Sequence, residues 1–106
     1  NMASNEIAIQ SGIIDYLTLK RYFFVRLNNI PPVQTVNGKM VFRRLPKGSV
    51  KGLPDLMVMK KGKVIFLEVK DKSKQSPDQI LFEAHCKSEQ IDYFIVRSID
   101  DVVKVL

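Results

Sequence analysis

Apolar and polar residues alternate along the chain in segments whose spacing predicts helices and strands. Residues 5–20 predict a helix, with Ser4 or Asn5 as a candidate N-cap. Its apolar side chains recur at close to helical spacing: Ile9, Ile13, Tyr16 and Leu17. Residues 22–27 (YFFVRL) and 40–45 (MVFRRL) are apolar and each predicts a strand, whereas residues 46–54 carry glycine and lysine and predict a loop.

The segment 52–70, GLPDLMVMKKGKVIFLEVK, predicts a β-hairpin around a Lys61-Gly62 turn. A two-residue turn places Asp55 directly opposite Glu68, on one face with Cβ atoms roughly 5 Å apart. Lys70 follows Glu68 by two residues and therefore lies on that face too. A register slip of one residue would remove this pairing. The remaining positions on both faces are largely apolar, which predicts a sheet covered by helices on both sides.

The last third of the chain predicts a helix, a strand and a short helix. Ser76-Pro77-Asp78-Gln79 has the pattern of a capping box, and the helix that it opens continues to about Gln90. Residues 93–97 (YFIVR) predict a strand, and residues 98–101 (SIDD) precede the final helix. We summarise the order as α-β-β-β-α-β-α. No repeat or linker divides it, so we expect a single domain over residues 1–106, with Asn1 before Met2 as a cloning remnant.

Charge and cysteine content narrow the class of protein. Seventeen Lys and Arg against eleven Asp and Glu give a net charge of +6, and the basic residues recur between Arg43 and Lys74. Such a balance is typical of proteins that bind a polyanion, although it also serves solubility. No apolar run approaches the ~20 residues of a membrane span, and the N-terminus lacks a signal-peptide pattern. With Cys86 as the only cysteine, we expect a cytoplasmic protein without disulfides or membrane contact.

The acids of the predicted hairpin call for a chemical explanation. Two facing carboxylates among apolar residues repel each other and lose hydration, which costs several kcal/mol in principle. A Mg²⁺ or Mn²⁺ ion removes this cost, because such ions bind one or two carboxylates together with water and phosphate oxygens. Lys70 could then hold the attacking water or stabilise the transition state. The alternative is that Asp55 lies in solvent, Glu68 forms a salt bridge with Lys70, and neither is catalytic.

Other catalytic classes find little support. His85 and Cys86 are adjacent in one helix and diverge by about 100°, which argues against a Cys-His nucleophile pair. We expect Cys86 in the core and His85 to be partly exposed or structural. The sequence has no CxxC or histidine cluster for zinc and no phosphate-binding glycine loop, so no nucleotide cofactor is expected.

The spacing of the acids resembles a known nuclease signature. Pro54-Asp55, twelve intervening residues and Glu68-Val69-Lys70 match the PD-(D/E)XK pattern. Four further segments accompany this pattern: GLPDL, SPDQ at a helix start, YFIVRS and the terminal DDV. With them, the chain resembles the VRR-NUC branch, the nuclease domain also found at the end of the Fanconi-associated nuclease. The resemblance runs from the first helix to Leu106. It implies an α/β, restriction-endonuclease-like fold with an αβββαβ core and a mixed sheet flanked by helices.

This resemblance implies roles for the matching residues. Asp55 and Glu68 would bind Mg²⁺ or Mn²⁺ through their side chains and Val69 through its carbonyl, with Lys70 as the catalytic lysine. Gln79 would position the lysine, the water or a phosphate, a role compatible with helix capping, and capping alone is the alternative.

Further residues complete the expected site. Glu6 matches an acidic position on the first helix that also binds metal, and a solvated helix residue is the alternative. Lys51, Lys72 and Lys74 flank the site in loops and are candidate DNA contacts, each alternatively only solvated.

The expected activity is metal-dependent hydrolysis of DNA phosphodiester bonds by an endonuclease. Proteins that resemble this chain as a stand-alone VRR-NUC domain occur in phages and prophages. A one-domain nuclease that cuts two strands is naturally a twofold dimer, so a homodimeric Holliday-junction resolvase acting on four-way DNA junctions is favoured. Two alternatives remain: a nuclease acting on flaps or on nicked or linear duplex, and a catalytically silent basic DNA-binding module.

Overall fold

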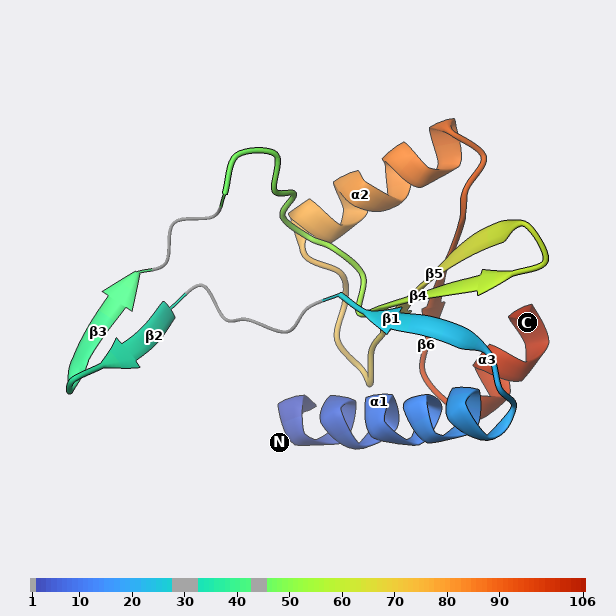
Figure 1. Ribbon diagram of the computed structural model, residues 1–106, viewed down its shortest axis with the longest axis horizontal. Helices are drawn as coiled ribbons and strands as arrows, with labels where there is room; N and C mark the ends of the chain where they lie inside the picture. Colours follow the sequence, from blue (N-terminus) through green and yellow to red (C-terminus); the bar gives the residue numbers. More distant parts are fainter. Residues whose placement is uncertain (1, 28–32, 43–45) are drawn as a thin grey trace.

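The computed structural model describes residues 2–27, 33–42 and 46–106 (Figure 1). The elements in this part follow one another as α1 (Met2–Leu19), β1 (Phe23–Arg26), β2 (Val33–Val36), β3 (Lys39–Phe42), β4 (Leu56–Lys60), β5 (Lys63–Val69), α2 (Pro77–Ser88), β6 (Asp92–Val96) and α3 (Ile99–Val105). None of the helices within these ranges combines the length and the apolarity needed to cross a membrane.

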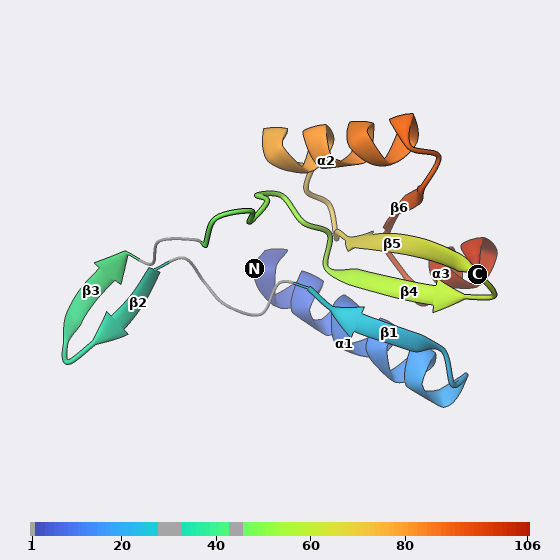
Figure 2. The ribbon, with the colours of Figure 1, turned by 45° about the horizontal axis from the view of Figure 1, so that its top comes forward.

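A four-stranded mixed sheet in the order β1-β4-β5-β6 forms the body of the molecule. β1 and β5 both pair with β4 in antiparallel fashion, and β6 joins β5 in parallel. α2 covers one face of the sheet, and α1 and α3 lie on the other (Figure 1, Figure 2). The expectation of a sheet covered on both sides is therefore confirmed.

The two faces of the sheet are packed differently. Toward α1 and α3 lies the buried core, made of apolar side chains from both helices and from the strands: Ile13, Leu17, Leu56, Val58, Ile65, Leu67, Val69, Val96 and Val102. Toward α2, the ring of Phe82 meets Phe66 edge-on, with ring centroids 5.3 Å apart, and also contacts Tyr93. Cys86 of α2 is buried as expected, and His85 is exposed.

The β4–β5 hairpin has the predicted register. Lys60 pairs with Lys63 and Met57 with Phe66, around a turn in which both Lys61 and Gly62 have positive φ angles. Two positive φ angles are typical of the type I′ turn that suits strand twist. The Asn37-Gly38 turn between β2 and β3 has the same feature.

Three sequence predictions need correction. Ser4 and Asn5 lie inside α1, which already begins at Met2, so neither caps the helix. A strand at Val33–Val36 was not predicted; it pairs with β3, at Lys39–Phe42, in a separate two-stranded sheet. Five strands therefore precede α2, whereas the predicted segments contained four and the summarised order counted three. Residues 43–45 of the predicted strand lie outside the described residues. The order α-β-β-β-α-β-α holds for the four-stranded sheet, with the β2–β3 hairpin inserted between β1 and β4.

Candidate metal-binding active site

The candidate acids meet at the end of the β4–β5 hairpin that lies away from its turn. Asp55 directly precedes β4, and its position is held at two points. Its main-chain carbonyl accepts a hydrogen bond from the Leu27 N–H at 2.9 Å, and its Oδ2 accepts one from the Val69 N–H at 2.8 Å. The Asp55 side chain is thus directed at the end of β5, next to Glu68.

Glu68 is the one buried charged residue in the described part of the chain, with 2% of its surface exposed. Its Oε2 accepts a hydrogen bond from Gln79 Nε2 at 3.2 Å and lies 3.9 Å from Lys70 Nζ. Its Oε1 is buried and has no hydrogen-bond partner among the described residues. Buried polar atoms are nearly always paired. A protonated Glu68 can hydrogen-bond to Asp55, whereas an ionised Glu68 has an oxygen available to a further ligand.

The electrostatic surroundings disfavour a charged Glu68. Burial contributes most, and the negative charge of Asp55 and a side-chain hydrogen bond to it add to this effect, so the pKa of Glu68 rises to about 9. Lys70 acts in the opposite direction, and Glu6 adds a further increase to this pKa. A buried carboxyl group beside another acid keeps its proton near neutral pH unless a cation takes the proton's place.

Gln79 joins the acid to the start of α2. Its backbone N–H donates to Ser76 Oγ at 3.2 Å, and its side-chain Oε1 accepts from the Ser76 N–H at 2.9 Å, which completes the predicted capping box. The remaining polar atom of the same amide, Nε2, is the one that reaches Glu68. The two roles considered for Gln79 are therefore geometrically compatible.

A glycine that the sequence analysis did not single out fixes this arrangement. Gly52 has φ +77°, and a Cβ atom on it would lie 2.4 Å from the carbonyl carbon of Asp78 and 2.7 Å from the Gln79 nitrogen. The backbone before Asp55 therefore packs directly on the first turn of α2, where no larger residue fits. Its presence at the start of the GLPDL segment was the signal in the sequence.

Glu6 lies beside the acid pair and is engaged elsewhere. Its Oε1 accepts a hydrogen bond from Ser73 Oγ at 2.6 Å, and the neighbouring Asn5 side chain donates to Asp71 at 3.2 Å. No group of three or more His, Cys, Asp and Glu side chains suited to a metal ion occurs in residues 2–27, 33–42 and 46–106. The structure thus brings together Asp55 and Glu68 without Glu6 as a third carboxylate.

The loop between β5 and α2 frames the site. Gln75 Nε2 donates to the hydroxyl of the buried Tyr93 at 3.1 Å, a contact that the sequence did not predict. Burial is the main cause that raises the pKa of Tyr93 to about 12, so this phenol stays protonated. Lys72 and Lys74 on this loop, and Lys51 on the loop before Asp55, are exposed to solvent.

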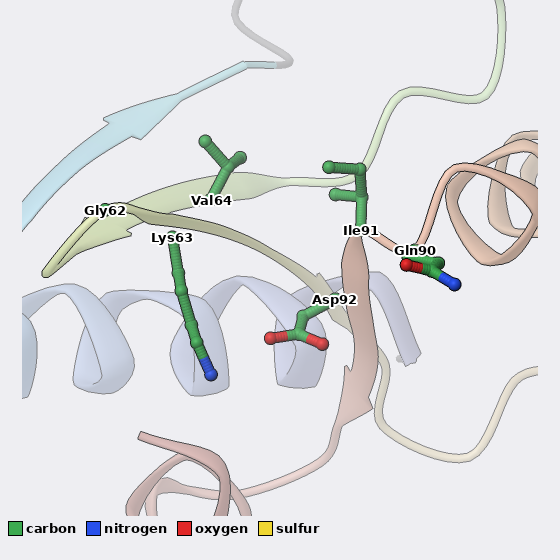
Figure 3. Close-up of a pocket in the computed structure, with 6 residues that line it drawn as sticks. All are labelled: Gly62, Lys63, Val64, Gln90, Ile91 and Asp92. Atoms are coloured by element: carbon green, nitrogen blue, oxygen red, sulfur yellow. The ribbon is translucent and has the colours of Figure 1, made fainter.

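A hollow at the other end of the sheet is separate from this site. Figure 3 shows it between the β4–β5 turn and the start of β6, with Lys63 and Asp92 among its lining residues. β5 runs from Lys63 at this hollow to Val69 beside the acids, so the length of the strand separates the two places.

Comparison with known proteins identifies the architecture. No protein-family model matches the sequence, and no curated protein matches it significantly. Among solved structures, one described as a VRR_NUC domain superposes with a TM-score of 0.64, covering 95% of this chain and 92% of that chain at 22% sequence identity. The chain has the VRR-NUC fold. The α/β class with a mixed sheet flanked by helices is therefore confirmed, and Asp55 and Glu68 occupy one end of the VRR-NUC sheet.

Proposed function

We propose that the chain is a nuclease of the VRR-NUC family that hydrolyses DNA phosphodiester bonds with the help of a divalent metal ion. The observation that carries this proposal is the buried Glu68 beside Asp55, with one carboxylate oxygen left without a partner among the described residues. A protein that only bound DNA would gain nothing from a buried acid beside a second carboxylate, because both repel phosphate. The fold and the net charge of +6 support the same proposal.

The donor set fits a hard cation such as Mg²⁺ or Mn²⁺. Asp55 and Glu68 would supply carboxylate oxygens and Val69 its main-chain carbonyl, all of them ligands that these ions prefer. When bound, the ion would polarise the scissile phosphate and lower the pKa of a water molecule. Glu6 already accepts a hydrogen bond from Ser73 through Oε1, so its other oxygen, Oε2, would be the one to join these ligands.

The chain's own polar groups would complete the chemistry. Lys70 places an ammonium group 3.9 Å from Glu68, where its charge can orient the attacking water and stabilise negative charge on the phosphate. Gln79 holds Glu68 in place from the N-terminal turn of α2, and this helix end itself favours an anion. The exposed Lys51, Lys72 and Lys74 would contact flanking DNA phosphates.

A homodimer acting on four-way junctions is the form of this activity that we favour. The strand pairing puts Phe23 beside Met59 on the sheet face that α2 covers, yet these side chains remain 61% and 46% exposed. Neighbouring Val25 is 36% exposed on the same face. A second copy packed there would bury this apolar surface, and twofold symmetry would present two active sites to one junction.

The deciding experiment is a cleavage assay on labelled four-way junction, flap and linear duplex, each in Mg²⁺, Mn²⁺ or EDTA. We expect symmetric junction cleavage that disappears in EDTA and falls at least about 100-fold in Glu68→Ala and in Lys70→Ala. The exposed Glu89→Ala and Lys104→Ala are matched controls that should cleave like the wild type.

Each other outcome selects a different function. Cleavage of flap or duplex alone, by a protein that light scattering finds monomeric, would retain the nuclease and exclude the resolvase. Binding without cleavage of any substrate by folded protein would identify a catalytically silent DNA-binding module.

A further inference from the structure

The positive charge of the chain is concentrated in one segment. The sequence from Asn28 to Pro54 contains five of the 17 basic residues and none of the 11 acidic ones, so it accounts for five of the six net positive charges. The rest of the chain is almost balanced. This segment is therefore the longest-range source of attraction to a polyanion that the net charge indicates, in addition to the lysines at the site itself.

The described part of this segment stands apart from the body. The β2–β3 hairpin contacts none of the other helices and strands of the described residues, and both views show it projecting away from the four-stranded sheet (Figure 1, Figure 2). The basic side chains described here, Lys39, Lys47 and Lys51, are all exposed. An isolated two-stranded hairpin is at best marginally stable in water, so this one is suited to gaining order from a partner.

Both ends of the segment are fixed at the candidate active site. The hydrogen bond from Leu27 N–H to the Asp55 carbonyl closes its base, directly beside the acid pair. Gly52 near its end packs on the first turn of α2, next to the residue that holds Glu68. The points where the chain leaves the body for this segment and returns from it therefore both lie beside Asp55 and Glu68.

We propose that residues 33–42 and 46–54 form a basic arm that binds the phosphate backbone of DNA beside the scissile bond. Lys39 and Lys47 contact phosphates on the side of the substrate away from the sheet, and Lys51 contacts them near the acids. DNA fits the arm because its backbone carries one charge per about 1.7 Å of duplex, and spaced lysines without acids match such a charge array. The choice of DNA as the polyanion rests on the proposed nuclease function.

The test measures DNA binding without cleavage. Fluorescence anisotropy in EDTA follows a labelled duplex and a labelled four-way junction across a salt series, for the wild type and two double variants. Lys39→Ala with Lys47→Ala removes charge from the arm, and Lys20→Ala with Lys104→Ala removes the same charge from exposed positions on the body. We expect the arm variant to bind DNA more weakly. The negative slope of log affinity against log salt should become shallower by about 2. The body variant should keep the wild-type slope.

Other results would overturn the arm. An unchanged salt slope in the arm variant, or an equal loss of DNA affinity in both variants, would show that lysines over the whole surface contribute equally to DNA binding. A loss of dimer in sedimentation with unchanged DNA affinity would make the hairpin, whose Met40 is 80% exposed, a contact between two copies. The results distinguish the two proposals. DNA binding that depends on the arm, without cleavage, would contradict only the nuclease proposal. Cleavage with DNA binding that does not depend on the arm would contradict only the arm proposal.

Discussion

The side-chain amide of Gln79 hydrogen-bonds Glu68 across 3.2 Å while its oxygen caps the helix that carries it. One side chain thus connects the start of α2 to the only buried acid of the described chain. Gln79 therefore has two roles, one in capping α2 and one in holding the candidate catalytic acid. Because different atoms make the two contacts, substitutions can test each role separately.

Replacing Ser76 and Gln79 separately distinguishes capping from positioning. Ser76→Ala removes the hydroxyl that caps α2 and should lower the free energy of unfolding by about 0.5–2 kcal/mol while leaving the Glu68 contact in place. Gln79→Ala removes the contact with Glu68 as well, so it should also weaken binding of Mn²⁺. Urea unfolding and calorimetric titration measure the two quantities. Equal metal affinity in both variants would limit Gln79 to capping.

The raised pKa of Glu68 predicts how stability depends on pH. Between its ordinary value of 4.5 and about 9, the folded protein binds this proton more tightly than the unfolded chain. In a metal-free buffer the free energy of unfolding should therefore fall as pH rises through this range, by at most about 1.4 kcal/mol per pH unit. Glu68→Gln keeps the shape without the charge, and its difference from the wild type in urea unfolding at pH 5 and pH 8 isolates the effect. A difference that does not change with pH would refute it.

Divalent cations should reverse this loss. Binding of Mg²⁺ or Mn²⁺ to the folded state alone raises stability by mass action, by about 2.7 kcal/mol at one hundred times the dissociation constant. Because the ion replaces a proton on Glu68, the rise in melting temperature should be larger at pH 8 than at pH 6. Glu68→Gln should show little shift at either pH, and EDTA should return the wild type to its metal-free value. An equal shift in Glu68→Gln would place the ion elsewhere.

Two glycines with positive φ angles provide a matched pair. Gly52→Ala forces a Cβ atom to within 2.4 Å of the Asp78 backbone, whereas Gly48→Ala, at φ +89°, meets nothing within 4 Å. Both variants carry the backbone strain of a left-handed alanine, about 1–2 kcal/mol, but only Gly52→Ala also displaces the first turn of α2. We expect a larger stability loss and weaker cleavage from Gly52→Ala. Similar effects from both would show that the close approach relaxes without cost.

Local sequence patterns predicted much of the fold. The Lys61-Gly62 turn fixes the hairpin register, and the Ser76-Pro77 pair marks the start of α2, because each depends on only a few neighbouring residues. β2 was missed because four residues that contact no helix or strand of the described chain other than β3 carry no pattern imposed by a core. The N-terminus of α1 was misplaced because Ser4 and Asn5 are also compatible with the helix interior.

The candidate site was predictable only where neighbouring strands determine it. The alternation of side chains along β5 and the hairpin register predicted Glu68 and Lys70 on one face next to Asp55. The 3.9 Å distance between Lys70 Nζ and Glu68 Oε2 agrees with this placement, as does the contribution of Asp55 to the raised pKa of Glu68. The hydrogen bond between Glu6 and Ser73 depends on how α1 packs on a distant loop, which no local pattern encodes. The fit of Gly52 against α2 is likewise a tertiary contact.

The hydrogen bond between Leu27 and Asp55 has an evolutionary consequence. It lets the chain leave the sheet and return to it at adjacent points, so the residues between Leu27 and Gly52 can change in length or sequence while β1 and β4 stay paired. Substrate preference can then diverge by exchange of this insert, under selection separate from that on the hydrolytic centre. Related chains are expected to vary most between Leu27 and Gly52 and least at the acids that follow.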